Sequence, residues 1–186
     1  MVKNKPVLCV FCGSSDGRDA AHAAAARRLG TLIGENGYDL VFGGGYVGLM
    51  GEVAHAARMA GAKITGVLPE FLRHLEPPAE NEEELVLTAD LQERKRLMLS
   101  MADAFVALPG GLGTMDEFFE VLTSAQLGEL HKPIVLLDSG GFFAHLKVLL
   151  DHIVAEGFAR KDIAELYHIA SKPEDVMEAL RLHRVA

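Results

Sequence analysis

Continuous apolar runs alternate along the chain with longer stretches whose apolar residues recur at helical spacing. The runs are rich in β-branched residues and show little polar alternation, which is typical of parallel strands that are covered on both faces. They predict strands at residues 6–11, 38–42, 63–68, 104–108, 133–137 and 167–170. The stretches between and after them predict helices at residues 19–36, 49–59, 90–101, 114–127, 142–156 and 173–183.

Strand and helix alternate over the whole length, which favours an α/β fold. We expect a Rossmann-like, doubly wound, mostly parallel sheet of six or seven strands with helices on both faces. We expect it to form a single nucleotide-binding domain over residues 1–186. The segment 69–84 contains Pro69, Pro77, Pro78 and several glutamates, and is expected to be an irregular excursion over the surface.

Charge and hydropathy limit the partners of this protein. The formal net charge of −8 argues against broad contact with DNA or RNA, because such contact needs clustered positive charge. No apolar run approaches the length of a membrane span or of a signal-peptide core. We therefore expect a cytoplasmic protein that binds neither nucleic acid nor membranes.

The two cysteines, Cys9 and Cys12, form a CxxC sequence on the first predicted strand. Residues three apart on a strand face opposite ways, whereas a redox CxxC normally begins a helix. Two buried thiols are therefore favoured over a redox or metal-binding pair. The eight histidines form no HExxH motif, and none pairs with a cysteine at zinc-ligand spacing, so we expect no metal.

Glycine-rich loops follow three of the predicted strands. They are Cys12-Gly13-Ser14-Ser15-Asp16-Gly17, Gly43-Gly44-Gly45-Tyr46-Val47-Gly48 and Pro109-Gly110-Gly111-Leu112-Gly113-Thr114. In a doubly wound sheet such loops meet at the carboxyl edge, where a strand–turn–helix unit aims backbone N–H groups at an anion. The second loop matches GxGxxG, but it follows the second strand, and Glu70 lies beyond the usual acid spacing of about 20 residues. A smaller phosphate-bearing ligand therefore fits better than NAD(P).

Charged residues accompany the third loop. Arg94, Leu97 and Met98 share one face of the helix predicted at 90–101, so Arg94 is able to point into a cleft while its neighbours touch the sheet. Thr114 and Glu117 have the S/T-x-x-E spacing of a capping box, which explains both residues without catalysis. A cap does not explain the glycines beside them, so a chemical role for Glu117 stays open.

The longest glycine motif, Pro109-Gly110-Gly111-Leu112-Gly113-Thr114-Met115-Asp116-Glu117, resembles the PGGxGTxxE motif of the LONELY GUY family of cytokinin-activating phosphoribohydrolases. Arg94-Lys95-x-x-Met98 is similar to the second signature of that family. Residues 43–51 are similar to its GGGxxGLMG stretch, and Cys12-Gly13-Ser14-Ser15 to its first loop. The resemblance covers essentially the whole chain, and the sequence departs from the family at residues 77–81.

The resemblance implies hydrolysis of the N-glycosidic bond of adenosine 5′-monophosphate (AMP), often N6-prenylated, to ribose 5-phosphate and a free base (a cytokinin or adenine). It also implies a homodimer. Arg94 and Glu117 match the catalytic pair of the family. Positions that match substrate-binding residues are Ser14, Gly44, Gly45, Glu76, Lys95, Met98, Pro109, Gly110, Gly111, Gly113, Thr114 and Thr123. Members often carry the label lysine decarboxylase, but we find no recognisable site for the pyridoxal cofactor of that reaction and expect no cofactor.

Two other functions would use the same loops. A non-catalytic nucleotide-binding or carrier protein would bind AMP without releasing the base. An NAD(P)-dependent oxidoreductase would bind that cofactor and be protected against heat by it. The residues alone do not distinguish AMP from an N6-substituted AMP as the preferred substrate.

Overall fold

The computed structural model describes residues 5–75 and 84–183. Within them, seven strands form one parallel sheet in the order β4-β3-β2-β1-β5-β6-β7. The strands are β1 (Val7–Phe11), β2 (Asp39–Phe42), β3 (Ile64–Pro69), β4 (Glu84–Thr88), β5 (Ala104–Ala107), β6 (Ile134–Leu137) and β7 (His168–Ala170). No helix in the described ranges is long and apolar enough to cross a bilayer.

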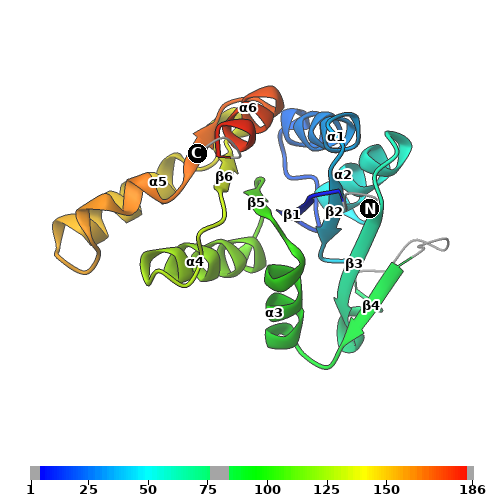
Figure 1. Cartoon of the computed structure of the whole chain (residues 1–186), viewed down its shortest axis with the longest axis horizontal. Coiled ribbons are helices and arrows are strands. Elements are labelled where there is room, and N and C mark those ends of the chain that lie inside the picture. The colour runs from blue at the N-terminus through cyan, green and yellow to red at the C-terminus, as the bar shows by residue number, and fades with distance from the viewer. Residues whose placement is uncertain (1–4, 76–83, 184–186) are drawn as a thin grey trace.

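Helices cover both faces of the sheet (Figure 1). One layer consists of α1 (Ala20–Glu35), α2 (Gly48–Met59) and α6 (Pro173–His183), and the other of α3 (Leu91–Met101), α4 (Leu112–Gln126) and α5 (Ala144–Ala155). Short 3₁₀ turns, η1 (Glu70–Leu72), η2 (Ser139–Gly141) and η3 (Lys161–Glu165), follow β3, β6 and α5. The expected doubly wound α/β fold is thus confirmed.

The central strand β1 shows why the strand sequences are continuously apolar. Leu8 and Val10 pack in the core beneath α1 and α2, whereas Cys9 and Phe11 pack in the core beneath α3 and α4. Both faces are covered, so every position has to be apolar. Cys12 belongs to the first core and Cys9 to the second, and both are buried thiols, as expected.

Two expectations about the elements are corrected by the structure. The segment 69–84 was expected to be irregular throughout, but its last residue begins β4, which pairs in parallel with β3 from Thr65↔Glu84 to Pro69↔Thr88. β4 is an edge strand, and Leu87 on it is exposed, so its apolar run is short. Helix α4 begins at Leu112, two residues before the expected start.

The order of the strands places a topological switch between β1 and β5. After β1 the chain adds β2, β3 and β4 on one side, and it then returns to place β5, β6 and β7 on the other. The loops after β1 and β5 meet at this point, where Gly13 N donates a hydrogen bond to Pro109 O at 3.1 Å. Doubly wound sheets bind their ligands in the crevice outside the carboxyl ends of the strands at such a switch.

Candidate active site

The third glycine loop ends at the uncapped N-terminus of α4. Gly111 is the N-cap residue, in an extended conformation (φ −88°, ψ −157°), and no described side chain caps the helix there. The first N–H groups of α4 therefore lack an intrahelical acceptor. Within the described residues, nothing lies within 4 Å of a Cβ placed on Gly111 or Gly113, so this helix end is open. An open helix N-terminus favours a phosphate or carboxylate.

The capping-box interpretation of Thr114 and Glu117 is wrong. Because α4 begins at Leu112, Thr114 is its third residue and Glu117 lies in its second turn, beyond the N–H groups that a capping box satisfies. Thr114 is buried, and its hydroxyl packs against Gly110, where a Cβ would collide with it. The buried carboxylate of Glu117 therefore needs another explanation.

Glu117 faces Arg94, as the resemblance implied for a catalytic pair. Arg94 Nη2 lies 3.5 Å from Glu117 Oε1, and the two side chains are only 11% and 9% exposed. Arg94 lies one turn into α3, whose N-terminus is capped by Asp90 through a 2.7 Å hydrogen bond from Glu93 N. The buried Nε of Arg94 has no hydrogen-bond partner among the described residues. A buried donor without a partner is costly, so Nε is where an oxygen of a ligand would be bound most favourably.

Gly43 makes room for the guanidinium of Arg94. A Cβ on Gly43 would overlap with Arg94 Nη2 and would lie 3.1 Å from Met50 Sδ. Gly43 was quoted in the second glycine loop but was not selected as a site residue. The signal was present, since Gly43 opens the GGGxxGLMG stretch, but the sequence does not show which side chain fills the space.

The buried thiol of Cys9 on β1 lies near enough to the ion pair for both charges to affect it. Burial raises the pKa of the Cys9 thiol well above its usual value, and the negative charge of Glu117 raises it further, whereas Arg94 acts in the opposite direction. Cys9 is therefore a neutral, packed side chain at physiological pH.

Lys95, the neighbour of Arg94, contacts two carboxylates of α4. Its Nζ lies 3.0 Å from Asp116 Oδ2 and 2.6 Å from Glu120 Oε2. Burial alone would lower the pKa of Lys95, but the hydrogen bonds to Glu120 and Asp116 outweigh that effect and raise it. Lys95 is therefore protonated, and its positive charge is matched within the protein.

The structure brings some of the other predicted site residues together at the N-terminus of α4 and places the rest elsewhere. Pro109, Gly110, Gly111, Gly113 and Thr114 surround the open end of α4, and Ser14 lies exposed on the adjoining loop after β1. Gly44 and Gly45 are buried, and the left-handed conformation of Gly44 (φ +83°) brings it against Val67 and Leu68 of β3. Three residues are not brought together with these: Met98 is buried in the core, Thr123 is exposed further along α4, and Glu76 lies outside the described residues.

A cavity of about 420 Å³ borders the open end of α4. Its walls include Pro109, Gly110 and Gly111 together with residues 15–19 of the loop after β1. This volume lies within the usual range for small-molecule sites, about 300–1,000 Å³. A ligand whose anionic group binds the end of α4 would therefore have space beside the glycine loops.

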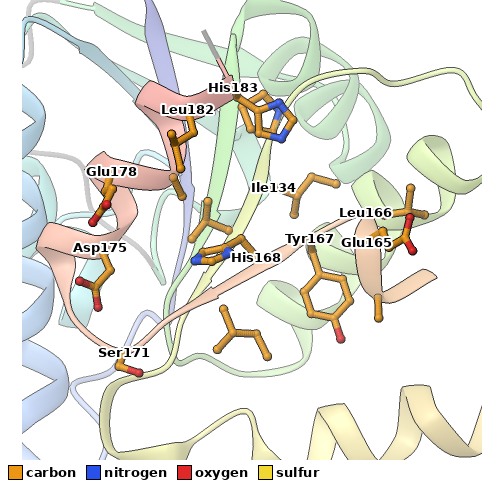
Figure 2. A pocket seen from close by; sticks show the side chains of 15 residues that line it. Ile134, Glu165, Leu166, Tyr167, His168, Ser171, Asp175, Glu178, Leu182 and His183 are labelled. Carbon is orange, nitrogen blue, oxygen red and sulfur yellow. The ribbon is translucent and has the colours of Figure 1, made fainter. Parts of the chain in front are cut away.

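A larger cavity, of about 620 Å³, lies at the β7 edge of the sheet (Figure 2). Tyr167 and His168 line it next to the sheet, and Asp175 and Glu178 line it from α6. None of the described residues that were expected at the site belongs to its walls. The Arg94–Glu117 pair and the glycine loops therefore remain the candidate active site.

Gly43→Ala is expected to lower kcat/KM for the reaction catalysed at this site roughly 10²-fold, because misplacing an active-site group by about 1 Å has an effect of that size. Gly43 is not one of the left-handed glycines, so alanine fits its backbone, and the new methyl group instead displaces the end of the Arg94 side chain. Steady-state kinetics and thermal unfolding measure the two effects separately. Adding Gly43→Ala to Arg94→Ala should change little, and an additive loss would show that Gly43 acts in another way.

Residues 50–180 match a family described as possible lysine decarboxylase. The chain is 45% identical over 155 residues to the cytokinin riboside 5′-monophosphate phosphoribohydrolase LOG of Oryza sativa subsp. japonica, which covers 83% of this chain and 64% of that protein. It is 46% identical over 151 residues to the cytokinin riboside 5′-monophosphate phosphoribohydrolase LOG7 of Arabidopsis thaliana. This match covers 81% of this chain and 70% of that protein.

Solved structures of similar shape include the Moco carrier protein from Chlamydomonas reinhardtii, with a TM-score of 0.74 and 24% identity over 97% of this chain and 98% of that one. The molybdenum cofactor binding protein from Rippkaea orientalis has a TM-score of 0.73 and 24% identity over the same shares of the two chains. These likenesses show the class of the fold, a doubly wound Rossmann-like α/β sheet. The sequence matches show that the chain belongs to the LONELY GUY (LOG) family.

Proposed function

We propose that the protein hydrolyses the N-glycosidic bond of AMP or of an N6-substituted AMP, and that it releases the free base and ribose 5-phosphate. The observation that carries this proposal is the buried pair of Arg94 and Glu117 next to the open end of α4. The names of the relatives support it. The aligned region spans 64% of the rice protein and 70% of LOG7, so the activity of the whole relative is carried over as a proposal.

Glu117 supplies the negative charge that this reaction needs. Cleavage of the bond builds positive charge on the ribose in an oxocarbenium-like transition state. A carboxylate fixed in a site with little water stabilises this charge, and an ionised carboxylate also activates an attacking water. Both roles need Glu117 to be ionised, and the neighbouring guanidinium of Arg94 favours the ionised form.

Arg94 and the end of α4 hold the rest of the nucleotide. The open N–H groups of α4 bind the 5′-phosphate. Arg94 is permanently charged, and its Nη2 faces Glu117. Its Nε has no partner in the described part of the chain and donates to an oxygen of the phosphate or the sugar. In this arrangement the phosphate is anchored at a distance from the bond that breaks, and the anchor orients the ribose toward Glu117.

The decarboxylase label of the family does not fit these residues. A pyridoxal-dependent decarboxylase needs a lysine amine that becomes neutral and forms a Schiff base with the cofactor. Lys95 is the buried lysine next to the candidate pair, but its amine is held by Asp116 and Glu120, and its pKa is raised. The residues near the glycine loops therefore support hydrolysis and not pyridoxal chemistry.

One experiment tests the proposed reaction directly. The protein is incubated separately with AMP and with isopentenyladenosine 5′-monophosphate, and the products are separated by chromatography. We expect free base and ribose 5-phosphate in equal amounts. Tight binding of AMP without base release would indicate a carrier instead, and protection against heat by NAD(P) but not by AMP would indicate an oxidoreductase.

We further propose that the protein is a cytoplasmic homodimer. Of the apolar residues of the α5 region, Phe143, Leu146 and Leu150 are buried against the sheet, whereas Leu149 and Phe142 are partly exposed. Val148 and Phe158 add exposed apolar surface at α5 and just after it. Several exposed apolar side chains on and beside one helix support an interface.

Light scattering at micromolar concentration is expected to give twice the mass of the chain. A Val148→Glu/Phe158→Glu double variant should shift the protein toward the monomer, because it places charge in the proposed apolar interface. Met59→Glu is the matched control, since Met59 is equally exposed at the end of α2 in the opposite layer. A monomeric wild type would contradict the homodimer.

A further inference from the structure

A second set of ion pairs joins α3 to α4 directly beside the catalytic pair. Arg94 and Lys95 are consecutive on α3, and their partners Asp116, Glu117 and Glu120 lie within two turns of α4. The backbones of the two helices approach each other closely at few points, and Figure 1 shows their axes running in different directions. Long side chains therefore make this connection.

Lys95 is placed to fix the position of α4. Asp116 and Glu120 are four residues apart, so they lie on one face of the helix, one turn above the other. Lys95 Nζ bridges them, at 3.0 Å from Asp116 Oδ2 and 2.6 Å from Glu120 Oε2. Two contacts a turn apart restrain both the rotation of α4 and its shift along its axis. Glu117, which lies between these two residues, is restrained with them.

We propose that Lys95 is a positioning residue that holds Glu117 of α4 at its working distance from Arg94 of α3, and that it does not contact the substrate. This inference rests on the proposed function, and it differs from the substrate-binding role that the family resemblance implied for Lys95. The amine has two carboxylate partners, and its side chain is only 6% exposed, so a phosphate would have to displace an existing ion pair to reach it.

Removal of the Lys95 amine should leave the protein folded. Methionine has nearly the same length and is apolar, so it fills the buried path of the lysine side chain. The carboxylates that lose their partner are not trapped, because Asp116 is 58% and Glu120 31% exposed, and water replaces the amine. Removing one partner of a buried ion pair is costly when the other charge stays buried. Here the remaining carboxylates are exposed, so this cost is avoided.

The test compares Lys95→Met with the wild type on AMP and on adenosine. For a positioning residue we expect kcat for AMP to fall roughly 10²-fold, while KM for AMP stays within about threefold, because substrate binding is retained and the reacting geometry is lost. The preference for AMP over adenosine should be unchanged. If Lys95 instead binds the phosphate, Lys95→Met will raise KM for AMP and reduce that preference, which would overturn the inference.

Additional variants separate positioning from a general loss of structure. Lys95→Arg keeps a donor for both carboxylates and should restore most of the lost kcat, whereas Lys147→Met, which removes an exposed ion pair to Asp151, should have no effect. In a Glu117→Gln background, Lys95→Met should cause little further loss, because the group that it positions no longer carries charge. Full additivity would overturn the inference.

Failure of the proposed function is recognised separately. If the wild type releases no base from AMP, the proposed reaction is wrong and the inference falls with it. If the wild type hydrolyses AMP and Lys95→Met retains its kcat, the reaction stands and the positioning role is wrong. Thermal unfolding with and without ribose 5-phosphate shows in each case whether the variant still folds and binds an anion.

Discussion

Glu117→Gln is expected to fold and to bind AMP, with kcat lowered about 10²-fold or more. Glutamine keeps the length of the side chain and an oxygen that accepts from Arg94, but it has no negative charge to stabilise an oxocarbenium ion or to activate water. The side chain is only 9% exposed and has no capping role, so the charge is not needed for the helix itself. Steady-state kinetics with AMP and binding of a non-hydrolysed product, ribose 5-phosphate, measure the two properties.

The stability of this variant also distinguishes the two interpretations of Glu117. A helix-cap role would have made Gln nearly neutral, because a capping box accepts either residue. In the structure Glu117 instead balances the buried charge of Arg94, and leaving that guanidinium without its counter-charge costs about 1–3 kcal/mol of the free energy of unfolding. Glu178→Gln on α6 is the control for a glutamate exposed elsewhere. A variant that retains most of its rate would move the catalytic role to another carboxylate, with Asp116 and Glu120 the nearest on α4.

The strands and most helices were predictable because each is marked by local sequence. A parallel strand buried on both faces, such as β1, has to be apolar at every position, and a glycine such as Gly37 or Gly157 ends a helix at little conformational cost. β4 was missed because an edge strand needs only a short apolar run, and here that run follows prolines and glutamates. The start of α4 was misplaced because the S/T-x-x-E spacing does not show that the chain already becomes helical after Gly111.

The candidate site was predictable as a set of residues but not as a set of contacts. The motifs selected Arg94, Glu117 and Lys95, yet no local pattern states that Arg94 lies against Gly43 or that Lys95 bridges Asp116 and Glu120. These contacts depend on how α3 and α4 meet after the chain has built β1 to β4 and returned across the sheet to β5. No local pattern in the sequence shows that long-range packing.

Loss of the 5′-phosphate is expected to lower kcat/KM by about 10²- to 10³-fold for adenosine relative to AMP. The open N–H groups of α4 and the guanidinium of Arg94 provide two to three charge-assisted hydrogen bonds, each worth about 1.5 kcal/mol, and their combined loss corresponds to this ratio. Because the anchor orients the ribose toward Glu117, kcat should fall together with the rise in KM.

Binding by the N–H groups of α4 and by Arg94 should depend on the position of the phosphate and not only on its charge. Adenosine 3′-monophosphate carries the same charge as AMP, but its phosphate cannot occupy the end of α4 while the glycosidic carbon lies at Glu117, so we expect it to react as slowly as adenosine. Ribose 5-phosphate should inhibit the reaction competitively, and ribose should not, because the open helix N-terminus discriminates in favour of an anion. If adenosine and AMP show comparable kcat/KM, the end of α4 does not hold the phosphate, and its missing cap has a different cause.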